Sequence, residues 1–232
     1  MTTPGPALVY KCPSCGNLAQ KGSINSGNTF GAVFYSDGRL DAPMLPEFPA
    51  ITKCKKCSGF YWLEDENKVG EYEPYERWGG PSEENEAAKK QWQDADRTRF
   101  LNPDELQEAI NARAHRDDPK KEKYLRKRLW WQLNDPARRK DAAKVLPNIT
   151  VQYAENCHGL LMLFIPRGVV PSDDDRMFVA ELCRNMELYD ECAAVLGTVK
   201  DPDYEPVIGI LKTQCEKRNR HVVVLQDDSR GR

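Results

Sequence analysis

Two Cys-x-x-Cys pairs in the first quarter of the chain, in KCPSCGN and TKCKKCSG, most strongly limit what it can fold into. Their cysteines are Cys12, Cys15, Cys54 and Cys57. Such pairs can hold a metal ion, form disulfides or carry out redox chemistry. A short Cys-x-x-Cys turn presents two thiolates from one loop, and its backbone N–H groups can donate to the sulfurs. The residues that follow each pair, Gly16 and Ser58-Gly59, suit a tight turn.

The two pairs together resemble a zinc ribbon, in which one ion sits at the end of a small sheet. We predict one structural Zn²⁺ bound by the four thiolates. The 38 residues from 16 to 53 are a long separation for this class, so a hairpin insertion is expected. The turn YSDGRL supplies one, because Asp37-Gly38 between apolar runs favours a hairpin. A segment of about sixty residues is marginally stable without such a staple.

Two other chemistries use the same residues. A dithiol oxidoreductase needs a Cys-x-x-Cys that opens a helix after a strand, and neither pair here precedes an amphipathic helix. Iron in a rubredoxin-like site has the same four-sulfur geometry. The aromatic run Phe60-Tyr61-Trp62 resembles that pattern, although the first pair lacks the aromatic residue that usually follows it. An iron electron carrier therefore stays an alternative to zinc.

The other four cysteines are spread through the last third of the chain, among apolar residues: Cys157, Cys183, Cys192 and Cys215. Free cysteine prefers burial and disulfides are rare in a reducing compartment, so we predict that these four belong to a hydrophobic core.

No catalytic constellation is evident in the sequence. Cys157 and His158 are neighbours on a predicted helix, so their side chains point about 100° apart and form no dyad by themselves. The chain has only three histidines and no phosphate-binding glycine loop, Gly-x-Ser-x-Gly elbow or His-Glu-x-x-His. Four cysteines also fill every position around a tetrahedral ion and leave none for water. We therefore expect a protein that is not an enzyme.

The charge balance gives the whole chain no general attraction to nucleic acid or to an anionic membrane, because the formal net charge is −2. No apolar run approaches the length of a membrane helix. The N-terminus MTTPGPALVYKC lacks the basic and apolar regions of a secretory signal. We expect a cytoplasmic protein without a membrane partner.

The strongest local charge is the segment KKEKYLRKR, residues 120–128, which precedes two tryptophans. Its basic residues are Lys120, Lys121, Lys123, Arg126, Lys127 and Arg128. Lysine and arginine can contact phosphates while aromatic residues stack on bases, so this segment is the candidate nucleic-acid interface. A solvated helix face whose opposite face carries the tryptophans into a core is the favoured interpretation.

Four start signals predict helices in the second half of the chain. Asn102-Pro103 and Asp118-Pro119 each combine an N-cap residue with a proline at the first helical position. Ser172 precedes three aspartates that suit a helix N-terminus, and Asp201-Pro202 precedes EPVIGILKTQCEKR.

Residues 173–202 resemble a single tetratricopeptide-like helical hairpin, with AELCRNM closing one helix and LYDECA opening the next. The glycine usual in the intervening turn is absent, where this chain has Met186-Glu187. Together with the first knuckle, the sequence is similar to a group of uncharacterised bacterial proteins that join a CPxCG-type zinc ribbon to tetratricopeptide-like helices. That resemblance implies no catalytic residues.

The expected fold class is α+β, with a β-rich zinc-ribbon domain and an all-α helical-hairpin domain. The expected parts are residues 1–66 (zinc ribbon), 67–101 (linker with a polar helix), 102–226 (helical domain) and 227–232 (mobile tail). The favoured function is a zinc-binding module that binds an unidentified protein partner. A nucleic-acid-associated factor and an iron electron carrier are the alternatives, and the oligomeric state is left open.

Overall fold

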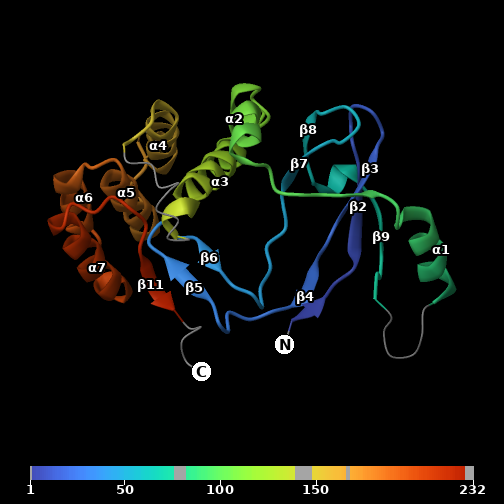
Figure 1. The fold of residues 1–232 in the computed structure, drawn as a ribbon, viewed down its shortest axis with the longest axis horizontal. Coiled ribbons are helices and arrows are strands. Elements are labelled where there is room, and N and C mark those ends of the chain that lie inside the picture. Colours follow the sequence, from blue (N-terminus) through green and yellow to red (C-terminus); the bar gives the residue numbers. More distant parts are fainter. Residues whose placement is uncertain (1, 76–81, 139–147, 166–167, 228–232) are drawn as a thin grey trace. The chain divides into compact units, whose positions relative to one another are not determined.

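The chain is mixed α+β and divides into two compact units in a computed structural model (Figure 1). The structure describes residues 2–75, 82–138, 148–165 and 168–227. The first unit, here called the cysteine unit, comprises residues 1–31 and 42–101. The second, the helical unit, comprises residues 32–41 and 102–232.

A four-stranded sheet forms the centre of the cysteine unit, in the order β10-β3-β2-β9. Its strands are β2 (Ala7–Lys11), β3 (Leu18–Lys21), β9 (Lys68–Tyr72) and β10 (Asp96–Arg97). The pairs β2–β3 and β2–β9 are antiparallel, whereas β10 runs parallel to β3. Alternate residues of β2 point to one face, where Ala7 and Val9 pack with Tyr72 in a small core.

Two further strand pairs complete this unit. They are β7 (Ile51–Lys53) with β8 (Phe60–Trp62), and β1 (Thr3–Pro4) with β4 (Ile24–Ser26). A short 3-10 turn (Asp65–Asn67) precedes β9.

The predicted linker, residues 67–101, contains regular structure throughout much of its described part. β9 and β10 belong to the central sheet, and the predicted polar helix is present as α1 (Glu83–Trp92). α1 packs on β9 through Trp92, whose ring lies over Gly70 where a side chain would otherwise stand. The strands could not be predicted from this polar, proline-rich segment. β9 lacks an apolar pattern because only one of its residues, Tyr72, is buried.

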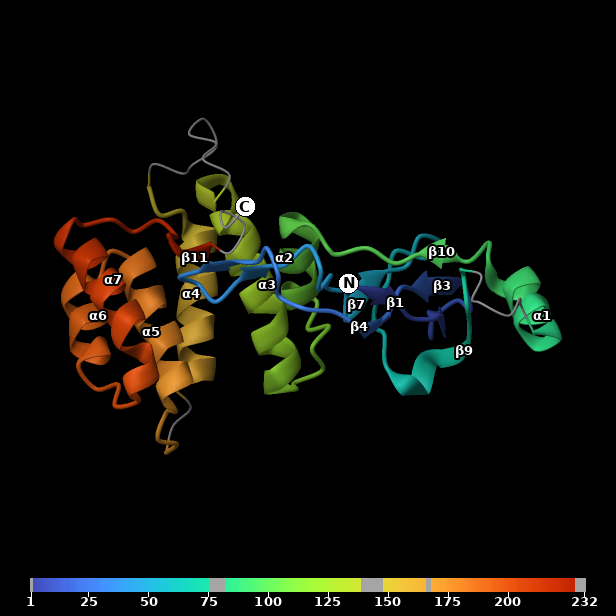
Figure 2. The same cartoon turned by 90° about the horizontal axis from the view of Figure 1, so that it is seen from below.

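Helices build the second unit, and α3 to α7 pack in chain order (Figures 1 and 2). Their bounds are α2 (Pro103–Asn111), α3 (Pro119–Arg138), α4 (Val151–Phe164), α5 (Asp173–Asn185), α6 (Tyr189–Leu196) and α7 (Glu205–Glu216), with a 3-10 turn at Pro202–Tyr204. The start signals are confirmed: Asn102 and Glu105 form a reciprocal capping box, and the Ser172 hydroxyl accepts from the backbone of Asp175.

The core of the helical unit contains Trp130, which has no exposed surface, together with apolar residues of α4 to α7. All four scattered cysteines are buried, as predicted, and Cys157 and Cys192 have no exposed surface. The predicted helix pair at 173–202 is present as α5 and α6. In its turn, Glu187 adopts a φ of 65°, at the place where glycine is more usual.

The predicted hairpin at YSDGRL is confirmed, with β5 (Val33–Tyr35), β6 (Leu40–Asp41) and a φ of 73° at Gly38. It lies in the helical unit, although its sequence position is between the two cysteine pairs. There it forms a sheet in the order β11-β5-β6 with the C-terminal strand β11 (Val224–Asp227). β11 contains the last two residues of the apolar run VVVL, residues 222–225.

Among the described helices, none combines the length and the apolar character that a bilayer span requires. Of the predicted mobile tail, residues 228–232 lie outside the described residues.

Candidate metal centre

Each Cys-x-x-Cys pair forms the turn of a β-hairpin. Residues 12–17 connect β2 to β3, and residues 54–59 connect β7 to β8. The two turns have the same hydrogen bonds. The Cys12 N–H donates to the Asn17 carbonyl over 2.8 Å, and the Cys54 N–H donates to the Gly59 carbonyl over 2.9 Å.

The two turns also share their backbone conformation at the residue after the second cysteine. Gly16 has a φ of 75° and Ser58 a φ of 59°. The sequence pattern Ser58-Gly59 left open which residue takes the strained position, and the structure places it at Ser58. The amide of each of these residues donates to the carbonyl of the first cysteine of its pair, over 2.9 Å in both cases.

The matched hairpins bring the four predicted sulfurs together. All four Sγ atoms lie within 4.8 Å of one another. Cys12 Sγ is 3.7 Å from Cys57 Sγ, and Cys15 Sγ is 3.6 Å from Cys54 Sγ. A tetrahedral ion with metal–sulfur bonds of about 2.3 Å has sulfur–sulfur edges of about 3.8 Å. The cysteine cluster therefore fits a single tetrahedral metal ion, and its soft thiolate donors suit zinc or iron.

The electrostatics of the cluster favour a cation. Burial raises the pKa of Cys54, but hydrogen bonds from the backbone of Cys57 and Lys56 and from the thiols of Cys15 and Cys57 together outweigh it and lower that pKa to about 7. The Asn17 N–H likewise favours the Cys15 thiolate, but burial and the three neighbouring sulfurs outweigh it and raise the pKa of Cys15 to about 12. Four thiolates at this spacing repel one another, so a divalent ion between them removes the main obstacle to their ionisation.

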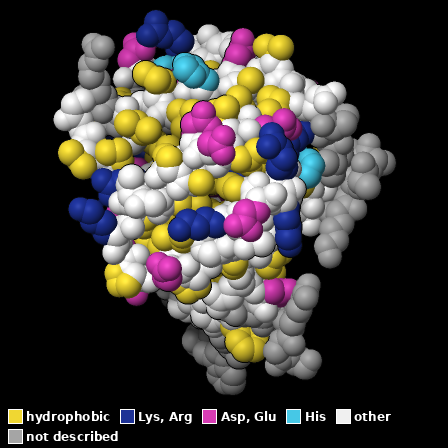
Figure 3. Space-filling model, turned by 90° about the vertical axis from the view of Figure 1, so that its left-hand side faces the viewer, with side chains coloured by type: hydrophobic (Ala, Val, Ile, Leu, Met, Phe, Trp, Pro, Cys, Tyr) yellow, Lys and Arg dark blue, Asp and Glu magenta, His cyan; other side chains and the backbone are white. Residues whose placement is uncertain are grey.

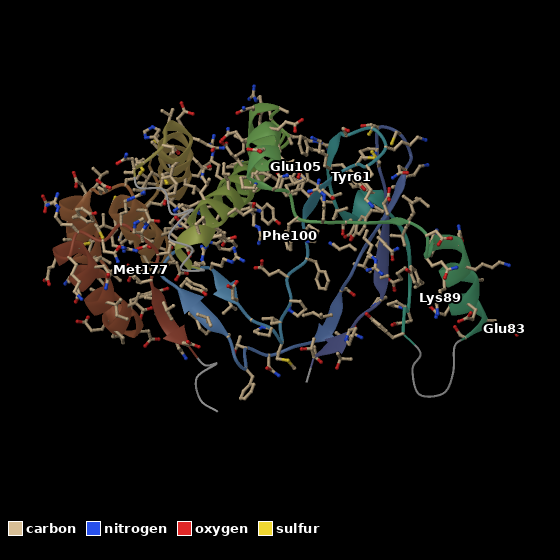
Figure 4. All side chains as sticks on the ribbon, viewed as in Figure 1. Tyr61, Glu83, Lys89, Phe100, Glu105 and Met177 are labelled. Carbon is tan, nitrogen blue, oxygen red and sulfur yellow. The ribbon has the colours of Figure 1, made fainter. Side chains whose placement is uncertain are left out.

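One side of the cluster is buried and apolar. Cys12 and Cys54 are 2% and 3% exposed and pack against Tyr10, Tyr61 and Leu63. Tyr61, labelled in Figure 4, lies on β8 directly after the second turn. Burial, followed by the nearby sulfurs, raises its pKa. The other side is more open, because Cys57 is exposed and Cys15 is half-buried.

Asp96 connects the two cysteine turns and was not identified from the sequence. Its carboxylate accepts from the Asn17 side-chain amide over 2.9 Å and pairs with the Lys55 ammonium over 3.0 Å. Asn17 first, and then Lys55, lowers the pKa of Asp96. Because β10 holds Asp96 beside β3 only in the folded sheet, nothing in the local sequence indicated this role.

The predicted basic residues of 120–128 lie on α3, and several engage their own unit. Lys123 pairs with Asp175 over 3.3 Å and lies 3.8 Å from the centre of the Phe164 ring. Arg126 pairs with Glu122 over 2.7 Å. Lys127 and Arg128 both lie over the ring of Trp131. Lys120 is exposed, and Lys121 is half-buried.

The tryptophans that follow this segment point into the core, as the favoured interpretation predicts, since Trp130 and Trp131 are 0% and 7% exposed. On the side of the helical unit that carries α6 and α7, charges of both signs are interspersed with apolar side chains (Figure 3).

Cys157 is buried whereas His158 is exposed, so the structure does not bring this pair together as a dyad.

Comparison with protein-family models, with curated proteins and with solved structures gives no match for this chain.

Proposed function

We propose that the chain is a non-enzymatic zinc-binding protein in which one Zn²⁺, held by Cys12, Cys15, Cys54 and Cys57, staples a zinc-ribbon-like cysteine unit. The observation that carries this proposal is the pair of matched hairpin turns, which place four sulfurs at tetrahedral spacing. The cysteine unit has only small cores around Val9 and Tyr10, so a metal crosslink between its two hairpins adds stability that its packing lacks.

The donor set supports a structural role for the ion. Four sulfurs complete a tetrahedral shell and leave no position for a reacting water molecule. A surface hollow of about 480 Å³ borders Cys15, Lys56 and Asp94, but it opens onto a sulfur that is already used as a ligand. Iron takes the same geometry, and its coloured thiolate complexes distinguish it from zinc.

The helical unit is the part that we assign to partner binding. Four large apolar residues are exposed around the C-terminal end of α4: Met162, Ile165, Val169 and Val170. Val170 is 82% exposed and Met162 is 62% exposed. Exposed apolar residues close together in the chain are typical of an interaction surface, and α5 and α6, whose sequence resembles a tetratricopeptide-like hairpin, follow them.

Metal analysis of the purified full chain tests the zinc assignment. We expect one zinc per chain and no visible absorption band. Cys54→Ser should lower zinc retention strongly, whereas Cys157→Ser, a change at a buried cysteine outside the cluster, should leave zinc content unchanged. A coloured protein with one iron per chain would contradict the assignment to zinc, and full zinc retention by Cys54→Ser would contradict the site.

Parallel affinity captures with the wild type and with Val170→Asp test the partner assignment. A protein that the wild type captures and the variant does not would support the four exposed apolar residues, Met162, Ile165, Val169 and Val170, as part of the partner surface. Leu188→Asp is a matched control, because Leu188 is 41% exposed outside this segment. Equal capture by all three forms would contradict the assignment. Salt-sensitive RNA or DNA binding that is lost on neutralising Lys120 and Lys121 would favour the nucleic-acid alternative instead.

A further inference from the structure

The chain enters the helical unit at two separate places. Residues 32–41 belong to it, whereas the residues on both sides of them, up to 31 and from 42 to 101, form the cysteine unit. These ten residues lie between Cys15 and Cys54 in sequence. An ion that joins Cys15 to Cys54 therefore closes a loop whose middle part is folded into another unit.

The tip of this hairpin, Asp37 and Gly38, packs against α3 and α5. Asp37 has no exposed surface, and its carboxylate accepts from Asn134 over 3.0 Å and from Arg138. The Trp131 indole N–H donates to the Asp37 carbonyl over 2.9 Å. Next to it, a Cβ on Gly38 would stand 2.6 Å from the Phe178 ring, so the tip fits closely against α5.

Ser36, the first residue after β5, attaches the turn to the helices. Its hydroxyl donates to Glu181 over 2.7 Å and accepts from the backbone of Val223 over 3.0 Å. Glu181 pairs with Arg184, and neither side chain has any exposed surface. Undocking of the hairpin would take the Ser36 hydroxyl away from the buried Glu181 carboxylate. Because a buried charged group that loses a hydrogen-bond partner costs free energy, undocking would destabilise the helical unit.

We infer that residues 32–41 couple metal loading of the cysteine cluster to the stability of the helical unit. The inference rests on the proposed metal site. With the ion bound, the two ends of the loop are held together, and the hairpin loses less conformational entropy when it docks. Because such coupling is reciprocal, a docked hairpin also raises the affinity of the cysteine cluster for its metal.

The direct test compares the full-length wild type with and without zinc. The measurements are the melting temperature of the helices by circular dichroism and amide exchange in α5 and β11. We expect chelation of zinc to lower the melting temperature and to speed exchange in both elements. Removal of bound zinc without any change in either measurement would overturn the coupling and leave the zinc assignment intact. A chain that binds no zinc would overturn both.

A matched pair of glycine substitutions locates the coupling. Gly38→Ala and Gly31→Ala both place a side chain at a positive φ, of 73° and 74°, but only Gly38 faces Phe178. We expect zinc affinity, measured by chelator competition, to fall at least about fivefold further in Gly38→Ala than in Gly31→Ala. Equal affinities would contradict the assigned role of the hairpin.

Should Gly38→Ala fail to fold, Arg39→Gln is the milder variant. Arg39 is partly exposed and donates to Asp135 of α3 over 2.7 Å, so its loss weakens docking without removing the buried tip. A smaller decrease in zinc affinity in the same direction supports the coupling, and an unchanged affinity in a folded Arg39→Gln protein overturns it.

Discussion

At the scale of single residues, Asp96 shows how a group outside the cysteine cluster positions its two turns. It holds Asn17 of the first turn and Lys55 of the second. Removing outer partners of metal ligands typically lowers metal affinity by about 10- to 100-fold. We therefore expect Asp96→Ala to lower zinc affinity about tenfold in a chelator competition. Asp94→Ala is the control, and an equal effect of both changes would contradict the specific role of Asp96.

The residue after each second cysteine gives a pair of predictions of opposite sign. Gly16→Ala places a Cβ at a φ of 75° and should cost about 1–2 kcal/mol of unfolding free energy. Ser58→Gly should stabilise the cysteine unit, because it removes a side chain from a φ of 59°. Gly59→Ala is the control, since its added Cβ would make only ordinary contacts. Urea unfolding of the zinc-loaded protein measures all three.

The pKa of Cys54 predicts the pH dependence of metal binding. Above its pKa of about 7, the free thiol is already ionised, and zinc displaces no proton from it. As the pH falls through 7, the thiol takes up a proton that zinc must displace, so zinc affinity decreases more steeply, by one further proton. Chelator competition across this range measures the slope. A slope that does not change near pH 7 would contradict the prediction.

At the scale of elements, α1 packs on β9 where the Trp92 ring covers Gly70, which has no side chain. Because the Trp92 ring occupies the place of a side chain at position 70, Gly70→Ala should displace α1 and cost about 1–3 kcal/mol. Trp92→Ala loses apolar packing by itself but frees that space. The loss of unfolding free energy in the double variant should therefore be smaller than the sum of the losses in the two single variants. Thermal unfolding of the four forms tests this, and strict additivity would argue against the contact.

The elements also show where sequence reasoning succeeds. Helix starts at Asn102, Pro119 and Ser172 were predictable because capping and proline preferences are local. The strands β9 and β10 were not, since β9 has only one buried residue, β10 has only two residues, and each depends on pairing with β2 or β3 for its conformation. β-Propensity depends strongly on such context.

At the scale of the whole molecule, the clustering of the four cysteines could be predicted from the sequence, and the unit to which the hairpin belongs could not. Two Cys-x-x-Cys pairs predict that their four sulfurs lie close together, because a tetrahedral ion takes four ligands. The hairpin at 33–41 carried the correct turn signal, but its burial depends on Asp37, Trp131 and Arg138 meeting across the sequence. The α+β class is confirmed. The observed units are divided elsewhere than at residue 66, because residues 32–41 belong to the helical unit and the cysteine unit continues to residue 101.

The central claim is that one zinc ion is held by these four thiolates. X-ray absorption spectroscopy of the purified full-length protein tests it most directly, because it reports both the element and its ligands. We predict a zinc edge and a single shell of four sulfur atoms at about 2.3 Å. An iron edge, a shell containing nitrogen or oxygen, or a protein without metal would contradict it.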